Sequence, residues 1–346
     1  MTRRGSFWIG LAAGAAAVLG MARLARERRA ISFEGRTVVI TGGSRGLGLV
    51  LARRFVDLGA RIAICARDEG ELRRAEQELN DRGGDVLAVE CDLMVPEQAQ
   101  KFIDDVRTRF GGIDVLINNA GVIQVGPLEE QTDKDFHDAM DIHFWAPYHT
   151  MQAAIPLMKR RGEGHIANIV SIGGKLAVPH LAPYSASKFA LSGLSKAFGN
   201  ELAKDGIKVT TVYPGLMRTG SHLNALFKGQ NEKEFAMFSL MDATPATSIN
   251  VERAAAKIID AIALGKSELV ITVQAKLAAM AGELFPEMVS TMMRTTTAFL
   301  PGEGGIGERL ATGLESRSDL VPDFLTSAID REAIENNELK PGEVLH

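Results

Sequence analysis

The sequence TGGSRGLG, residues 41–48, decides the fold. It follows the β-branched run Thr37–Thr41 and opens a helical stretch that ends near Leu58. Glycines in such a turn let the backbone bend sharply and approach a pyrophosphate, and the start of a helix offers free N–H groups to an anion. The spacing is G-x-x-x-G-x-G, not the G-x-G-x-x-G of other dinucleotide folds. The order of strand, glycine-rich turn and helix predicts a dinucleotide-binding domain. The alternative is a plain strand-to-helix turn.

Outward from this turn, short β-branched runs alternate with stretches of helical length such as 68–82 and 96–110. The predicted strands are Thr37–Thr41, Arg61–Cys65, Val86–Cys91, Val115–Asn118, His165–Ser171, Val209–Tyr213 and Leu269–Val273. Seven such alternations imply right-handed crossovers and a parallel sheet covered on both faces. The sequence therefore predicts an α/β, doubly wound Rossmann fold with a seven-stranded parallel sheet over residues 30–273. Residues 1–29 form a separate hydrophobic N-terminal segment, predicted as a helix, and residues 274–346 a C-terminal extension of apolar helices and a polar, loosely ordered tail.

Composition excludes several classes of function. The chain has 346 residues and a net charge of −4, and its first 29 residues carry six arginines against one glutamate, so the remainder is more acidic still. An acidic body without a basic stripe argues against nucleic acid as a partner. Two cysteines make no disulfide framework and suggest a reducing compartment. The seven histidines show no metal-binding spacing, so we expect no metal.

The residues that close the second strand bear on the cofactor. An acidic residue there would bond the adenosine ribose and repel a 2′-phosphate. This strand ends instead at Cys65-Ala66-Arg67, and Arg45 lies in the glycine-rich turn. Two guanidiniums near one phosphate favour NADP(H) over NAD. Asp68 argues the other way unless it caps the next helix. Asp92 is placed to accept a bond from the adenine amino group, or else it forms a turn.

A tyrosine and a lysine lie four residues apart in Tyr184-Ser-Ala-Ser-Lys188. On a helix both side chains share one face, and the cation favours the phenolate that a Tyr acid/base needs. Ser171 closes the preceding predicted strand, where its hydroxyl can hold a substrate oxygen. Singly, each residue also fits an ordinary structural role. Together they indicate carbonyl reduction or alcohol oxidation, in which Tyr184 exchanges the proton.

Six motifs make the chain resemble the short-chain dehydrogenase/reductase family. They are TGGSRGLG (41–48), CDL (91–93), NNAG (118–121), IVSIGG (169–174), YSASK (184–188) and YPGLMRT (213–219). The resemblance implies that Tyr184 is the acid/base, that Lys188 lowers its pKa and bonds the nicotinamide ribose, and that Ser171 positions the carbonyl. Asn118 would help to shape the cofactor cleft, and Thr219 would contact the carboxamide. The expected cofactor-binding residues are Gly42, Ser44, Arg45, Gly46, Leu47, Gly48, Arg67, Asp92, Leu93, Asn119, Ala120, Gly121, Tyr184, Lys188, Pro214, Gly215 and Thr219.

One position departs from the family pattern. Members usually have Asn in the helix after the fourth strand, where it holds a water that links the lysine to solvent; here that position is His143. If His143 takes over this catalytic role, its protonation places a second cation near Lys188. Turnover is then expected to fall at acid pH through an ionisation that is absent from His143→Asn. The alternative is a packed helix residue.

The segment between Pro214 and Asn250 is a lid-type insertion with many large apolar residues. It predicts a lipophilic carbonyl or alcohol substrate, unless these side chains pack on the domain or on a second copy of the chain in a homo-oligomer. One alternative function is a 3-oxoacyl reductase that acts on carrier-linked substrates, for which Lys228 and Lys233 give a thin docking patch. The other is a non-catalytic NADP(H)-binding sensor.

Residues 7–22 form an uncharged run of sixteen between clusters of arginine. As a helix it is about 24 Å long, short of the ~30 Å hydrocarbon core. We expect an uncleaved membrane anchor with the catalytic domain on the cytosolic side, where NADPH is supplied. The alternatives are an export signal, and an Ala-rich helix that lies on the protein itself or on a membrane surface. The alternative location is that of a soluble cytoplasmic protein.

Overall fold

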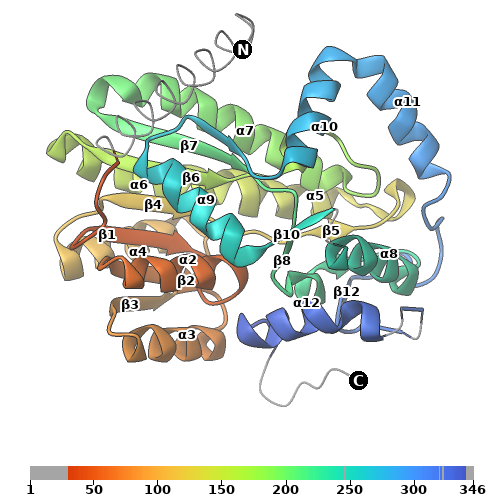
Figure 1. Ribbon diagram of the computed structural model, residues 1–346, viewed down its shortest axis with the longest axis horizontal. Coiled ribbons are helices and arrows are strands. Elements are labelled where there is room, and N and C mark those ends of the chain that lie inside the picture. Colours follow the sequence, from red (N-terminus) through yellow and green to blue (C-terminus); the bar gives the residue numbers. More distant parts are fainter. Residues whose placement is uncertain (1–29, 245–246, 319, 322, 340–346) are drawn as a thin grey trace, which may run out of the picture.

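The computed structural model describes residues 30–244, 247–318, 320–321 and 323–339, and its centre is a seven-stranded parallel sheet (Figure 1). The strand order is β11-β7-β6-β4-β1-β2-β3, and every neighbouring pair is parallel. The strands are β1 (Thr37–Thr41), β2 (Arg61–Ala66), β3 (Asp85–Glu90), β4 (Val115–Asn118), β6 (Gly164–Ile169), β7 (Ile207–Tyr213) and β11 (Glu268–Val270). This confirms the predicted sheet.

Helices cover both faces of the sheet because each strand is apolar on both sides. One buried cluster joins the sheet to α2 (Gly46–Asp57), α3 (Glu69–Asp81) and α9 (Val251–Ala263). A second cluster joins the other face to α4 (Pro96–Phe110), α6 (Ala146–Arg161) and the end of α7 (Ala182–Leu202). The chain is therefore doubly wound, as predicted.

Local capping explains several helix ends. The Asp68 carboxylate accepts a hydrogen bond from the backbone N–H of Glu71, so it caps α3. Pro96 begins α4, and Gly111 ends it with a φ of 81°, a left-handed conformation that favours glycine. The role of Asp68 at this helix end removes the one feature of the second strand that argued for NAD.

Two predicted strands end two or three residues earlier than expected, whereas the ends of the other five agree to within one residue. β6 stops at Ile169, so Ser171 lies two residues beyond it, at the start of the 3₁₀ turn η3 (Ile172–Gly174). β11 stops at Val270, because the Thr272 hydroxyl accepts a bond from the N–H of Ala275 and so starts α10 (Val273–Leu284). The helix cap at Thr272 thus ends the strand earlier than the β-branched composition of residues 269–273 predicts.

The lid-type insertion is folded together with the C-terminal extension. β8 (Leu216–Arg218) pairs with β10 (Ser248–Asn250), and β9 (Leu226–Phe227) lies between β5 (Gln124–Val125) and β12 (Ala311–Thr312). The remaining elements are α5 (Asp133–Met140), α8 (Asn231–Ala243), α11 (Pro286–Thr297), α12 (Asp323–Glu335), the 3₁₀ turns η1 (Leu128–Glu130), η4 (Ala203–Asp205) and η5 (Ser221–Asn224), and the π-helical turn η2 (Asp141–Trp145).

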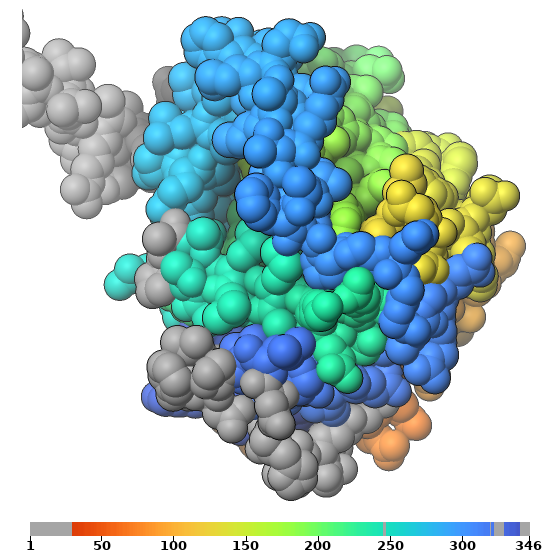
Figure 2. Space-filling model, turned by 90° about the vertical axis from the view of Figure 1, so that its right-hand side faces the viewer, coloured from red at the N-terminus to blue at the C-terminus, as the bar shows by residue number. Residues whose placement is uncertain are grey.

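Over the described residues between 302 and 339, the expectation of a loosely ordered tail is wrong. β12 completes a small sheet, and α12 packs against α8 of the lid (Figure 1). Figure 2 shows the extension, in blue, spanning this face of the molecule from top to bottom. Its polar residues do not disorder it, because they find partners in the lid and around the start of α2, both far away in the sequence.

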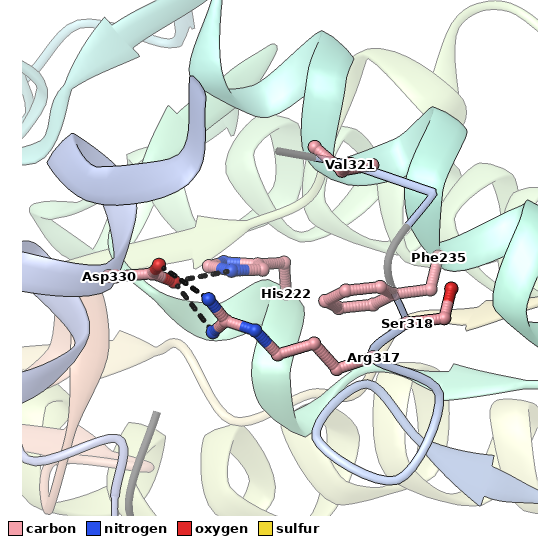
Figure 3. A pocket seen from close by; sticks show the side chains of 6 residues that line it. All are labelled: His222, Phe235, Arg317, Ser318, Val321 and Asp330. Carbon is pink, nitrogen blue, oxygen red and sulfur yellow. Dashed lines mark hydrogen bonds and ion pairs between the residues drawn. The ribbon is translucent and has the colours of Figure 1, made fainter. Parts of the chain in front are cut away.

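One of these long-range contacts surrounds His222, which is buried in η5 between the lid and α12 (Figure 3). Its ring stacks on Phe235 at 5.8 Å between centroids, and its Nε2 lies 3.8 Å from Asp330 of α12. Asp330 also pairs with Arg317 at 3.1 Å. These contacts attach the C-terminal helix to the lid.

The predicted N-terminal hydrophobic helix and anchor, residues 7–22, lie outside the described residues. Among the helices that are described, none combines the length and the apolar character that a membrane crossing requires.

Candidate active site

Ser171, Tyr184 and Lys188 meet at the carboxyl edge of the sheet. Ser171 follows β6, and Tyr184 lies in the first turn of α7 with Lys188 one turn later. Gly173 stands between the first two: a Cβ at this glycine would be 3.4 Å from Ser171 Oγ and 3.2 Å from a ring carbon of Tyr184. The Ser171 hydroxyl accepts a bond from the N–H of Gly173 at 3.0 Å. A side chain at this position would be tight against both groups, so glycine favours the close approach of Ser171 and Tyr184.

Burial shapes the protonation of this cluster. Burial raises the pKa of Tyr184, and a hydrogen bond from Ser171 partly opposes that rise. Burial also lowers the pKa of Lys188 to about 7, because a desolvated ammonium is disfavoured. The ammonium donates to the carbonyl of Ile169 at 3.0 Å and lies 5.7 Å from the centre of the Tyr184 ring. Burial thus moves the pKa of Tyr184 upward and the pKa of Lys188 downward, because it disfavours the charged form of each group.

His143 lies in the π-helical turn η2 and is 1% exposed. Its Nε2 accepts a bond from the N–H of Val122, and its Nδ1 lies 2.8 Å from the hydroxyl of Ser187. That hydroxyl donates to the carbonyl of Tyr184, so Nδ1 carries the proton and donates to Ser187. Both ring nitrogens are engaged by protein groups.

The catalytic role expected of His143 therefore needs correction. No ring nitrogen is left to hold a relay water. Burial, with repulsion from Lys188, holds the pKa of His143 well below its usual range, so the ring stays neutral at working pH. Its ring instead packs edge-on against Tyr184 at 5.2 Å between centroids. The geometry makes His143 a positioning residue for Tyr184.

The NNAG motif holds the glycine-rich turn in place. The N–H groups of Asn119 and Ala120 both donate to the hydroxyl of Thr41, and the Asn119 amide donates to the carbonyls of Thr41 and Gly42. A Cβ at Gly42 would be 2.9 Å from Ala120 Cα, and one at Gly48 would be 2.0 Å from the Gly42 carbonyl. These glycines are required by close packing of backbone against backbone.

Asn118 has a structural part beside this turn. Its amide donates to Asn168, and its carbonyl accepts from Thr150 at 2.6 Å. Asn168 continues the chain of buried bonds to Ser195 on α7. This polar network ties β4 and β6 to the helix that carries Tyr184.

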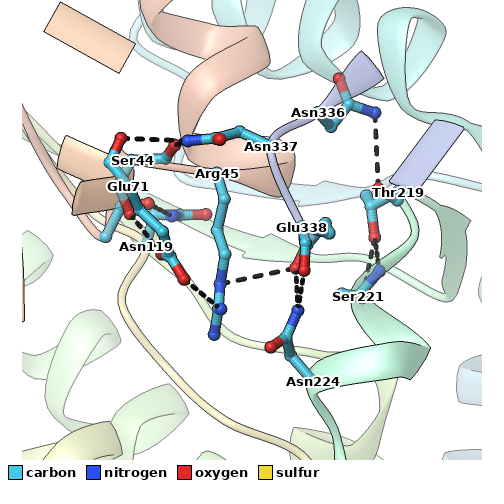
Figure 4. A network of polar contacts seen from close by, with 11 residues as sticks. Ser44, Arg45, Glu71, Asn119, Thr219, Ser221, Asn224, Asn336, Asn337 and Glu338 are labelled. Atoms are coloured by element: carbon cyan, nitrogen blue, oxygen red, sulfur yellow. Dashed lines mark hydrogen bonds and ion pairs between the residues drawn. The ribbon is translucent and has the colours of Figure 1, made fainter. Parts of the chain in front are cut away.

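The start of α2 suits an anion. Arg45 makes no side-chain cap there, and the first turn holds no acidic residue. The Arg45 guanidinium, however, pairs with Glu71 at 3.0 Å and with Glu338 at 3.4 Å (Figure 4). Arg67 is exposed at the end of β2 and forms no ion pair with any residue that the structure describes.

The other expected cofactor residues lie along the same edge. Thr219 bonds Ser221, and Pro214 accepts the N–H of Ile172 through its carbonyl. Asp92 accepts the N–H of Met94, which shows the turn-forming role. The residues not yet placed have these positions: Ser44 is buried beside Glu71, the side chains of Leu47 and Leu93 belong to the two cores, Gly46 begins α2, Gly121 faces His143 and Lys188, and Gly215 faces Thr272.

Sequence reasoning missed four residues at this edge. Glu71, Asn224, Asn336 and Glu338 surround Arg45 and the start of α2 (Figure 4). Glu71 lies in the first turn of the helix that follows Arg67, and this position was the one local signal in the sequence. Nothing in the local pattern around residue 338 marks its return to the glycine-rich turn.

Comparisons with known proteins agree with this geometry. Residues 36–228 match the family model described as short chain dehydrogenase. A 32% identity over 268 residues relates the chain to "Dehydrogenase/reductase SDR family member 7B" of Danio rerio, covering 75% of this chain and 85% of the relative. "Granaticin polyketide synthase putative ketoacyl reductase 1" of Streptomyces violaceoruber is 40% identical over 52% of this chain and 67% of its own length.

A solved structure is similar over the same region. L-sorbose reductase of Gluconobacter frateurii, complexed with NADPH and L-sorbose, aligns with a TM-score of 0.63 and 27% identity, over 70% of this chain and 97% of its own. The family model covers more than half of the chain, and the Danio relative is matched over most of its length. The chain therefore belongs to the short-chain dehydrogenase/reductase family.

Proposed function

We propose that the protein is an NADP(H)-dependent oxidoreductase that interconverts a carbonyl and an alcohol. The observation that carries the proposal is the approach of Ser171 and Tyr184 around Gly173, with Lys188 one helical turn away. A hydroxyl that orients, a buried phenol and a cation are the groups that this proton exchange needs. The relatives named as ketoacyl reductase and L-sorbose reductase support the same reaction class.

Each of the three residues has a distinct task in this scheme. The hydroxyl of Ser171 holds the substrate oxygen, and Tyr184 donates its proton to that oxygen during reduction and takes it back during oxidation. The ammonium of Lys188 stabilises the phenolate that forms on Tyr184. NADPH, when bound, supplies the hydride. His143 keeps the ring and the backbone of Tyr184 in place through Ser187.

The start of α2 fits the dinucleotide. A helix start without a side-chain cap, beside Arg45 and with Arg67 exposed nearby, suits a pyrophosphate and a 2′-phosphate. We expect NADPH to bind at least ~10-fold more tightly than NADH, which corresponds to ~1.4 kcal/mol. Arg67→Asp should erode this preference in a titration with both cofactors. Equal affinities for the wild type would contradict it.

We propose a lipophilic substrate. A groove of about 840 Å³ adjoins the segment that joins Ser171 to Tyr184, and mainly apolar side chains line it. Among them are Leu176, Val178, Phe189, Val289 and Met293. Ser185, the residue after Tyr184, lies in the same lining. A large and mostly apolar concavity beside an active site is typical of a site for an apolar ligand.

The lid gives less support than its sequence suggests. Leu223, Phe227 and Phe235 are buried in a small core of their own, so these side chains pack on the protein. The carrier-linked alternative also loses Lys228, which is 2% exposed and paired with Asp135 at 2.6 Å. Of the two predicted docking lysines, Lys233 alone is exposed.

A panel of carbonyls and alcohols, assayed with both cofactors, tests the function. We expect turnover with NADPH for apolar ketones, and a loss on the order of 100-fold or more in Tyr184→Phe. The matched control is Tyr213→Phe, since Tyr213 is also a buried tyrosine but its hydroxyl bonds Ser192 and not Ser171. NADPH binding without turnover of any carbonyl would favour the non-catalytic sensor.

We further propose that the protein associates with a membrane, its catalytic domain on the cytosolic side, and with a second copy of itself. The anchor of residues 7–22 rests on sequence alone. Exposed apolar side chains along α10 and α11 support the association, among them Leu277, Leu284, Phe285 and Met292. Trp145, which is 43% exposed, supports the contact between copies.

A further inference from the structure

The last described residues of the chain cross the start of α2. After α12 ends at Glu335, the carbonyl of Asn336 accepts the N–H of Gly46 at 2.9 Å. The amide of Asn337 donates to the carbonyl of Ser44 at 2.8 Å (Figure 4). The backbone groups of Ser44 and Gly46 in the glycine-rich turn are thus both hydrogen-bonded to a segment almost 300 residues further along the chain.

A carboxylate sits at the same place. Glu338 Oε2 lies 3.4 Å from Arg45 Nε and accepts the amide of Asn224 at 2.8 Å. Its other oxygen, Oε1, would be only 2.5 Å from a Cβ at Gly46, so it lies directly against the backbone of the helix start. Glu338 is buried, and burial raises the pKa of its carboxyl to about 7. Arg45, Asn224 and the absence of a Cβ at Gly46 are what allow an acidic group to be buried there.

The segment is fastened on both sides of the cleft. On the α2 side, Arg53 donates to the Asn336 side chain at 2.9 Å and to the Glu335 carbonyl at 2.7 Å. On the lid side, the Asn336 amide reaches the carbonyl of Thr219 at 3.4 Å. The segment therefore bridges the glycine-rich turn and the loop expected to hold the nicotinamide end.

We propose that residues 336–338 compete with NADP(H) for the start of α2, and that Glu338 sets the affinity for the cofactor. The inference rests on the proposed function. In this structure the segment occupies the N–H of Gly46 and the guanidinium of Arg45. An incoming pyrophosphate and 2′-phosphate need these same groups. A carbonyl and an acidic side chain from the chain itself stand in for the oxygens of the ligand. The apparent affinity for the cofactor is then the intrinsic affinity multiplied by the fraction of molecules in which the segment is released.

The decisive variants are Glu338→Gln and a chain that ends at Glu335. The first removes the acidic group and keeps the size, and the second removes the segment and leaves α12 intact. We expect the dissociation constant for NADPH to fall by about 10-fold in the shortened chain and by a smaller factor in Glu338→Gln. Glu335→Gln is the matched control, because this exposed residue precedes the segment and should bind NADPH as the wild type does. Thermal melting shows whether each variant is folded.

Hydrogen exchange on the full-length chain gives an independent readout. Addition of NADPH should speed exchange at the N–H of Glu338, which donates to the Ala333 carbonyl. Weaker NADPH binding in the shortened chain, or slower exchange at residue 338, would show that the segment holds the bound cofactor in place. Unchanged binding would show that the segment has no effect on the cofactor. Either result overturns the proposal. If no form of the chain binds NADPH, the proposed function fails, and this inference fails with it.

Discussion

At the scale of single residues, the site combines groups that are costly to bury. Lys188 shows this cost most clearly, because the ammonium is desolvated and burial lowers its pKa from 10.5 to about 7. The sequence predicted that Lys188 would face Tyr184, since the i, i+4 spacing alone places them on one face. It could not predict the size of the desolvation, which depends on how the sheet and α7 close around the side chain.

Lys188→Met should separate activity from stability. A lysine whose pKa is lowered on folding destabilises the fold fully below the folded value, and the penalty disappears as pH rises towards the unfolded value. In the cofactor-free protein the variant should therefore be more stable at pH 7 by a few kcal/mol, roughly, with the gain shrinking towards pH 10. Its turnover should fall ~100-fold or more. Melting curves at several pH values test this, with the exposed Lys204→Met as control. A variant less stable than the wild type at pH 7 would contradict the burial argument.

His143→Asn gives a second residue-scale test. Because His143 is neutral and its pKa is held well below 6.5, the pH–rate profiles of wild type and variant should share their acid limb between about pH 5 and pH 7. His143→Leu should instead leave the N–H of Val122 unpaired and cost ~1–3 kcal/mol of stability, with reduced turnover. An acid limb that disappears in His143→Asn would restore the ionisation predicted from the sequence.

At the scale of elements, the strands of the sheet were predictable and the C-terminal elements were not. β1 and β4 have the predicted bounds, because apolar runs between turn residues are local signals. β12 and α12 carry no comparable signal. β12 exists through its pairing with β9, and α12 through its contact with α8, and both partners lie far away in the sequence.

Gly220→Ala should loosen α12 from the lid. Gly220 has a φ of 85°, and a Cβ there would be 2.2 Å from Ala333 Cα, so both strain and contact with α12 oppose the change. Gly83 is a matched control, with a φ of 84° and nothing within 4 Å of its Cβ position. Gly83→Ala should cost only the ~1–2 kcal/mol of left-handed strain, and Gly220→Ala clearly more. Denaturation and limited proteolysis after residue 320 measure the difference. Equal costs would mean that α12 does not depend on this contact.

At the scale of the whole molecule, the doubly wound fold and the family follow from motifs that repeat a known order. The motifs do not reveal that the C-terminal extension folds back and contacts the first of them. From the sequence, residues 30–273 and 274–346 were predicted as separate parts. In the structure, Glu338 contacts Arg45 in the first motif, and Asp330 contacts His222 in the lid. Charge pairs of this kind have no sequence periodicity, so only the folded chain brings them together.

The location of the protein in the cell depends on the whole chain, because both ends of the sequence bear on it. Residues 7–22 and the exposed apolar side chains of α10 and α11 together favour a membrane surface. We expect the full-length protein to sediment with membranes, and a chain that begins at Ala30 to be largely released with its activity intact. In the shortened chain, Phe285→Glu with Met292→Glu should abolish residual binding to lipid vesicles, since these side chains are 57% and 55% exposed on the helix pair. Leu58→Glu, at an exposed apolar residue that ends α2, should leave that binding unchanged. Full-length protein found wholly in the soluble fraction would refute the anchor, and equal vesicle binding by all three shortened chains would exclude α10 and α11 as the contact.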